Sequence, residues 1–269
     1  MTSTNHNYKV NYSDTSTRTY GIIKSLRNYY MYNALRLKSF GLCPYVDHFQ
    51  TAYQDKDYGC GYRNFQMMLS YLFTVPHMKS LLFDGTGSFP PILKIQEILE
   101  EAWRKGFDRM GASDLNFKLR NTTKWIGTSE IAVLFSFFKI RTGIYEFKSP
   151  HPNQPNNDLI KWIVNYFSKN SKQDFLSPLY LQHSGHSRTV VGYEESSDGS
   201  ISILIFDPAM KGRTLAENIK NSKIYPIKTS SRTFTKKEYQ ILAIKPKPLS
   251  DYEWEQSKIL KRETGMFSS

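Results

Sequence analysis

The residue best suited to covalent chemistry is Cys60, which lies between two glycines directly before a predicted helix. A helix N-terminus carries partial positive charge and unpaired N–H groups, which lower the pKa of a thiol and can hold an oxyanion. The flanking glycines allow the backbone and a substrate to come close. A small buried cysteine in a turn would fit the same context, so Cys60 needs a partner to count as a nucleophile.

That partner must be a base, and histidine is the side chain that changes charge near neutral pH. Three of the six histidines lie in the polar N-terminal segment or in predicted loops: His6, His77 and His151. The remaining candidates are His48, His183 and His186. We favour His186, because the strand that carries it belongs to a predicted hairpin whose other strand ends in an acid beside it.

His186 and Asp207 are predicted to lie at the same end of this hairpin. The strand after His186 leads to the turn SSDGS at 196–200, and the returning strand ends just before Asp207. The midpoint between the two residues falls within about two residues of the centre of that turn, as antiparallel pairing requires. A carboxylate there can orient the imidazole, so with Cys60 the three residues have the types and placement of a catalytic triad.

Five helices and four strands are expected to position these residues. The helices have apolar residues three and four apart and are predicted at 20–40, 61–73, 92–105, 128–138 and 158–169. Thr128 or Ser129 is the expected N-cap of the fourth helix, and Asp158 that of the fifth. The strands are rich in Ile, Val, Leu and Tyr and are predicted at 179–182, 188–193, 201–206 and 240–245. Helices first and an antiparallel sheet second indicate an α+β domain.

The chain divides into four predicted segments. Residues 1–19 are polar and expected to be disordered, and 20–40 form a helical arm that ends before Gly41 and Pro44. The catalytic α+β domain covers 41–249, and 250–269 form a C-terminal helix or tail that begins with a capping box. The arm is apolar enough that we expect it to pack on the domain. A partner-binding arm is the alternative.

Composition and charge narrow the class of protein. Only two cysteines occur, no signal-peptide core is visible, and the longest apolar run, 131–138, is too short to span a bilayer. We therefore expect a cytoplasmic or nuclear protein with reduced thiols and no membrane association. The net charge of +12 comes from residues 1–40 and 211–269, where the basic residues are dispersed. This pattern favours solvated surfaces over a nucleic-acid site.

Four stretches resemble the family that includes the ubiquitin-fold-modifier-specific proteases and the zinc-finger-containing ubiquitin peptidase. They are GCGYRNFQM at 59–67, WIGTSEI at 125–131, LYLQHSGHSRTVVG at 179–192 and LIFDP at 204–208. The resemblance implies a papain-like α+β fold, with helices packed on an antiparallel sheet, and cleavage after the C-terminal glycine of ubiquitin or a relative. It also implies that Cys60 is the nucleophile, His186 the base and Asp207 the residue that orients it, with no metal or organic cofactor.

One departure from the family pattern favours one branch. The modifier-specific proteases resemble one another in an Asp-Pro-His motif whose histidine is the base, whereas this chain has Asp207-Pro208-Ala209. The base is then His186, as in the ubiquitin-cleaving branch. We expect a deubiquitinating thiol isopeptidase that acts on ubiquitin or polyubiquitin chains. The alternatives are a protease for the related ubiquitin-fold modifier and a non-catalytic ubiquitin-binding module.

Further site residues are suggested by the same comparison. Papain-like enzymes commonly place a polar side chain shortly before the cysteine, so Gln50 and Gln54 are candidate oxyanion donors, although either could cap a turn. The ubiquitin tail ends in two glycines and needs a narrow channel. Trp125 and Gly127 are expected to form one wall of it, although an isolated Trp125 would equally suit the core.

Overall fold

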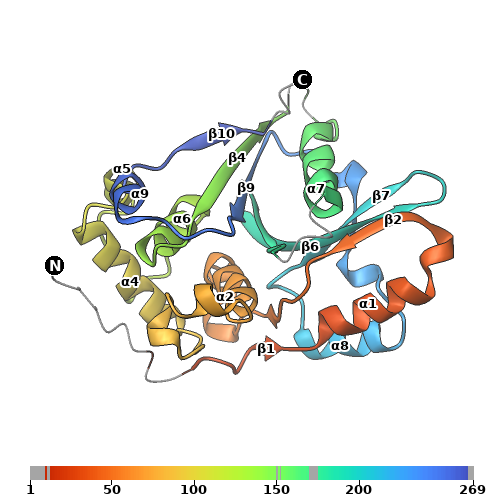
Figure 1. Ribbon diagram of the computed structural model, residues 1–269, viewed down its shortest axis with the longest axis horizontal. Coiled ribbons are helices and arrows are strands. Elements are labelled where there is room, and N and C mark those ends of the chain that lie inside the picture. The colour runs from red at the N-terminus through yellow and green to blue at the C-terminus, as the bar shows by residue number, and fades with distance from the viewer. Residues whose placement is uncertain (1–9, 11–12, 150, 152, 170–174, 266–269) are drawn as a thin grey trace.

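A mixed sheet runs through the centre of the protein. The computed structural model describes the chain except residues 1–9, 11–12, 150, 152, 170–174 and 266–269 (Figure 1). The strands of the sheet follow the order β10-β4-β9-β5-β6-β7-β8, with β2 joined to β6, and only the β10–β4 pair is parallel. Their bounds are β2 (Leu37–Leu42), β4 (Thr142–Lys148), β5 (Leu179–His183), β6 (His186–Ser196), β7 (Ile201–Phe206), β8 (Lys228–Ser230), β9 (Glu238–Ile244) and β10 (Arg262–Thr264). Two short strands, β1 (Arg18–Thr19) and β3 (His48–Phe49), pair with each other.

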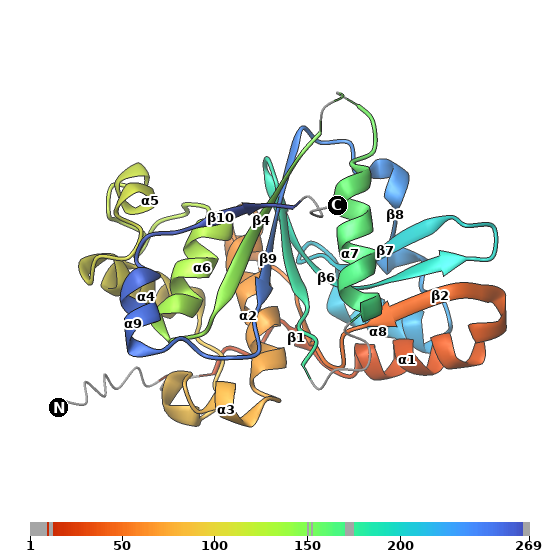
Figure 2. The same cartoon turned by 45° about the horizontal axis from the view of Figure 1, so that its top comes forward.

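Helices gather around this sheet in two groups, which both views show (Figures 1 and 2). One group contains α4 (Ile92–Arg104), α5 (Arg109–Asp114), α6 (Thr128–Phe137) and α9 (Asp251–Gln256), and the other α1 (Ile22–Tyr32), α7 (Asn157–Lys169) and α8 (Gly212–Lys220). Helix α2 (Cys60–Leu72) lies between them against β5 and β6, followed by the short α3 (Pro76–Lys79). All of α2 after Cys60 is buried, so its first turn is held rigidly. No helix in the described part of the chain is both long and apolar enough to cross a membrane.

The predicted helices and strands are largely confirmed, but two N-caps are wrong. Gly127, one residue before the predicted Thr128, caps α6, because the Glu130 carboxylate accepts a hydrogen bond from its N–H at 2.7 Å. Asn156 caps α7 in place of Asp158, through its side-chain oxygen and the Leu159 N–H. The capping box at the start of α9 is confirmed.

The predicted helix at 20–40 is wrong beyond Tyr32. Residues 37–42 instead form β2, which pairs with the second half of β6, because β5 reaches only the first half of that strand. The apolar face of α1 is buried, and the Tyr30 hydroxyl donates to Glu194 at 2.7 Å. The expectation that this segment packs on the domain is therefore confirmed.

The ends of the described chain also contribute to the fold. The disorder predicted for 1–19 is wrong for residues 13–19, which include β1 and the buried Asp14, while 1–9 and 11–12 lie outside the described residues. After α9 the chain adds β10 beside β4. Neither β4 nor β10 was predicted. For β10 the reason is that it is exposed throughout and lacks the alternation of polar and apolar residues that marks a half-buried strand.

Candidate active site

Cys60 begins α2, and both of its glycine neighbours are required by close packing. A Cβ atom built on Gly59 would lie 2.2 Å from the Asp55 carboxylate. A Cβ on Gly61 would lie 2.3 Å from the main-chain oxygen of Ile126. The absence of side chains at these two positions therefore lets Asp55, in the loop before α2, and Ile126, before α6, pack closely beside Cys60.

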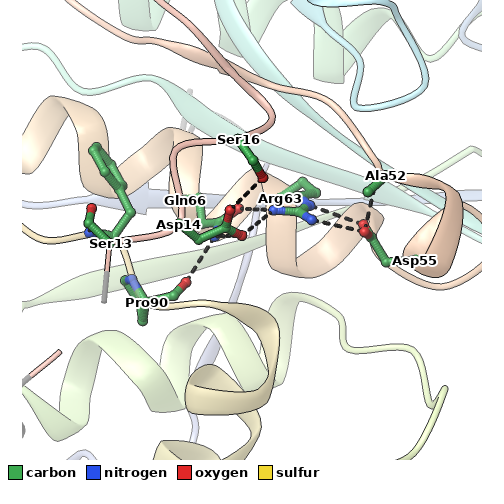
Figure 3. Close-up of polar contacts among 9 residues, drawn as sticks. Ser13, Asp14, Ser16, Ala52, Asp55, Arg63, Gln66 and Pro90 are labelled. Carbon is green, nitrogen blue, oxygen red and sulfur yellow. Dashed lines mark hydrogen bonds and ion pairs between the residues drawn. The ribbon is translucent and has the colours of Figure 1, made fainter. Parts of the chain in front are cut away.

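The first turn of α2 is locked by a buried ionic network around Arg63 (Figure 3). Its guanidinium binds Asp55 through two hydrogen bonds of 3.0 and 2.8 Å, and Asp14 through a third of 2.8 Å. Gln66 accepts from the same guanidinium and donates to the Pro90 carbonyl. Because Arg63 lies one turn beyond Cys60, this network ties the nucleophile's loop and helix to the N-terminal segment.

His186 and Asp207 meet as predicted, but the strand register differs. The pairing of β6 with β7 shifts by one residue near Val191. On the His186 side of this irregularity Thr189 pairs with Phe206, so the next pair in the same register places Asp207 opposite Arg188. Residues two apart on a strand share a face, so His186 still reaches the carboxylate. Its Nε2 lies 3.0 and 2.9 Å from the two oxygens of Asp207. The other ring nitrogen, Nδ1, is left for the thiol.

Asp207 is held by three further groups. The Ala209 N–H donates to its Oδ1 at 2.9 Å. Arg188 Nε lies 3.0 Å from Oδ2 but lacks hydrogen-bond geometry, so it contributes mainly charge. The buried His48 donates from Nε2 to the Asp207 main-chain oxygen at 2.8 Å, and burial lowers the pKa of His48, which keeps this ring neutral. His48 thus holds the main chain of Asp207, a role that its position twelve residues before Cys60 did not suggest.

The electrostatics favour an ion pair between thiol and imidazole. Burial would raise the pKa of Cys60, but hydrogen bonds with His186 and Ser187 outweigh burial and lower it. The hydrogen bond to Asp207, followed by that to Cys60, raises the pKa of His186 to about 9 against the effect of burial. A lowered thiol pKa and a raised imidazole pKa together favour the thiolate–imidazolium pair over the neutral thiol and imidazole. This is the reactive form of a nucleophilic cysteine.

A cavity of ≈ 190 Å³ opens onto the sulfur. Its lining includes Cys60, Trp125, Gly127, Gln182 and His186. The structure thus brings the predicted wall residues Trp125 and Gly127 to the nucleophile, and Trp125 is 53% exposed, so it is not a core residue. Such a position suits contact with a substrate chain.

The two candidate oxyanion donors do not line this cavity. The Gln50 side-chain oxygen accepts from the Gly212 N–H at 2.7 Å and so holds the start of α8, and Gln54 is exposed on a short helical turn. Gln182 occupies the cavity wall instead. Its Oε1 accepts from the Thr128 N–H and hydroxyl at 2.6 and 2.9 Å, which fixes the amide orientation and leaves Nε2 as the free donor group. The available sequence signal was its place four residues before His186, on the preceding strand β5, which pairs with β6.

The two cysteines should react at very different rates. We expect iodoacetamide to label Cys60 at least about 100-fold faster than Cys43 at pH 7, because Cys43 is completely buried and burial raises its thiol pKa. Because the pKa of Cys60 is lowered, its labelling should persist near pH 6, where ordinary thiols are protonated. Peptide mass spectrometry over time measures both rates. Equal rates in folded protein would contradict the assignment, and denatured protein, in which both should react alike, is the control.

The sequence of this chain is similar to those of known peptidases. A sequence model of Peptidase family C78 matches residues 36–242. Zinc finger-containing ubiquitin peptidase 1 of Homo sapiens is 38% identical over 244 residues, which cover 87% of this chain and 42% of that protein. Ubiquitin carboxyl-terminal hydrolase mug105 of Schizosaccharomyces pombe is 31% identical over 165 residues, which cover 61% of this chain and 65% of that protein. The chain thus spans less than half the length of the zinc-finger relative.

The fold also matches a solved structure. The crystal structure of UfSP from C. elegans superposes with a TM-score of 0.56 at 16% identity, covering 87% of this chain and 38% of that one. At this identity the likeness concerns the fold alone. It establishes the papain-like α+β architecture expected from the sequence motifs.

Proposed function

The chain belongs to Peptidase family C78, and from this premise we propose that it is a deubiquitinating thiol isopeptidase that cleaves after the C-terminal glycine of ubiquitin. The observation that carries the proposal is the contact of His186 with both Asp207 and the Cys60 thiol beside an open cavity. This imidazole lies between a carboxylate and a thiol and is partly open to solvent. It has the geometry of a catalytic base.

The reaction follows from the positions of these groups. The Cys60 thiolate attacks the carbonyl carbon of the terminal glycine, and the oxyanion forms near the N-terminus of α2. We assign the Gln182 Nε2 as a second donor to this oxygen, because its amide is already oriented by Thr128. The imidazolium of His186 then gives its proton to the leaving lysine nitrogen, and the C–N bond breaks. The product at this stage is a thioester between glycine and Cys60.

Hydrolysis completes the cycle. Neutral His186 takes a proton from water, the hydroxide attacks the thioester, and the Cys60 thiolate leaves. Asp207 stabilises the imidazolium at each stage at which it forms, and Ala209, Arg188 and His48 hold Asp207 in place. Every proton that leaves one group is received by another in this scheme.

Three observations support ubiquitin, rather than the related ubiquitin-fold modifier, as the substrate. One relative is named a ubiquitin peptidase and another a ubiquitin carboxyl-terminal hydrolase, and the position after Asp207-Pro208 is Ala209, which supplies no imidazole. The cavity at Cys60 is also small, ≈ 190 Å³, which suits a tail that ends in two glycines.

A ubiquitin probe with a thiol-reactive C-terminal trap tests the proposal. We expect a stable adduct on Cys60 that is lost in Cys60→Ala and retained in Cys43→Ala, which removes only the buried thiol. The same trap on the related ubiquitin-fold modifier should react far more slowly. Exclusive reaction with that second modifier would overturn the ubiquitin assignment, and absence of any adduct would favour a non-catalytic binding module.

A further inference from the structure

Beside the catalytic residues lies a groove whose lysines, Lys236 and Lys237, have no part in the proposed chemistry. It consists of two adjoining cavities of ≈ 490 and ≈ 510 Å³ that share His183 and Lys236 in their linings. The first reaches Asp207 and Arg188. The second reaches Lys237, and also Gln182 of the cavity at Cys60. We call these two cavities the basic groove.

The groove has an excess of positive charge. Its two carboxylates already have cationic partners: Asp207 contacts His186 and Arg188, and Glu238 lies 3.6 Å from Lys148. The ammonium groups of Lys236 and Lys237 form no ion pair within the described part of the chain, and both residues are exposed. Burial lowers the pKa of His183, and the charges of Arg188, His186 and Lys236 lower it further. An anion in the groove would relieve this crowding of cations.

The groove lies on the side of the base. The His183 ring centroid is 6.2 Å from that of His186 and 5.8 Å from that of Tyr239, which lines the groove. In amide cleavage the leaving nitrogen receives its proton from the base, so the leaving group must depart past His186. Trp125 and Gly127 line the cavity at Cys60, where the acyl group would lie, and neither lines the groove. The groove therefore adjoins the protein that is released.

We propose that the basic groove binds an acidic side chain of the leaving-group protein, located close in sequence to the modified lysine. This inference rests on the proposed function and adds a specificity for the released partner. Lys236 and Lys237 supply the attraction, while the buried rings of Phe234 and Tyr239 form an apolar wall that limits hydration of the bound carboxylate.

Ubiquitin linked through an isopeptide bond to short peptides provides the test. The peptides carry Glu, Gln or Lys at the positions flanking the modified lysine, and each kcat/KM is divided by that for ubiquitin with a small fluorogenic leaving group. For the wild type we expect the Glu peptide to exceed the Gln peptide by about fivefold, and the advantage to shrink with added salt. In Lys236→Glu the order of the Glu and Lys peptides should reverse. Lys161→Ala, on the exposed side of α7, should preserve the wild-type order.

Each outcome bears on one proposal. Equal normalised rates for the three peptides in the wild type, or an unchanged preference in Lys236→Glu, would overturn the groove assignment while cleavage of the small substrate continued. Failure of the wild type to cleave even the small substrate would overturn the proposed function, and the groove inference with it.

Discussion

Replacement of His186 by alanine is expected to lower kcat/KM for a ubiquitin isopeptide by about 10⁴-fold or more, because both the base and the proton donor to the leaving amine are lost. The side chain of His186 is only partly buried, at 26% exposure, so the melting temperature should change little. Steady-state kinetics beside thermal unfolding monitored by circular dichroism separates lost chemistry from lost structure.

The companion variant Asp207→Asn keeps the imidazole but removes the charge that stabilises its protonated form. We expect a smaller loss of activity and a shift of the alkaline limb of the pH–rate profile to lower pH. The sign follows because Asp207 is the main cause of the raised His186 pKa of about 9, and leaving-group protonation requires the imidazolium. An alkaline limb that did not move would show that another group sets it.

Two histidine controls complete this experiment. His77→Ala removes an exposed ring that forms a hydrogen bond with the Pro246 carbonyl, far along the chain from the catalytic residues, and activity should stay at the wild-type level. His183→Ala removes the neighbour of His186 and should cost less than about tenfold, since its Nδ1 contacts its own loop at the Ser184 oxygen. Loss of activity in His183→Ala with activity retained in His186→Ala would assign the base to the other histidine.

Replacement of Arg63 by methionine is expected to cause the largest loss of stability. The side chain is 5% exposed and Asp55 is 4% exposed, so the variant would leave a buried carboxylate without its cation. Removal of one partner of such a pair costs about 3–5 kcal/mol of unfolding free energy. For a chain of this size the melting temperature should fall by about 10 °C.

Matched substitutions show whether burial is the cause. Arg104→Met removes an ion pair with Glu101 in which the arginine is 71% exposed, and its effect should stay within about 0.5 kcal/mol. Arg63→Lys keeps the charge but loses the bidentate contact with Asp55, so its loss of unfolding free energy should lie between those of the two methionine variants. Similar losses for Arg63→Met and Arg104→Met would contradict a special role for the network.

The sequence by itself determined the parts of the site that depend on local structure. Cys60 between two glycines, ahead of an amphipathic helix, required no knowledge of the rest of the chain. His186 and Asp207 could be placed together because a hairpin relates its two strands through one turn. The resemblance of four motifs to a peptidase family is likewise confirmed by the family match over 36–242. The catalytic roles of the three residues stay predictions until the kinetic measurements above are made.

Only the tertiary structure decided which distant segments complete the site. Gln182 became the oxyanion candidate in place of Gln50 and Gln54 because Thr128, on a separate helix, turns its amide toward the cavity. His48 became a support of Asp207, and Asp14 an anchor of Arg63, through contacts that span 159 and 49 residues. Residues 37–42 became a strand because β6 offered an unpaired stretch. These long-range contacts form because buried polar groups must find hydrogen-bond partners somewhere in the folded domain. The periodicity of residues along the chain carries information only about neighbours in sequence, so it does not identify those partners.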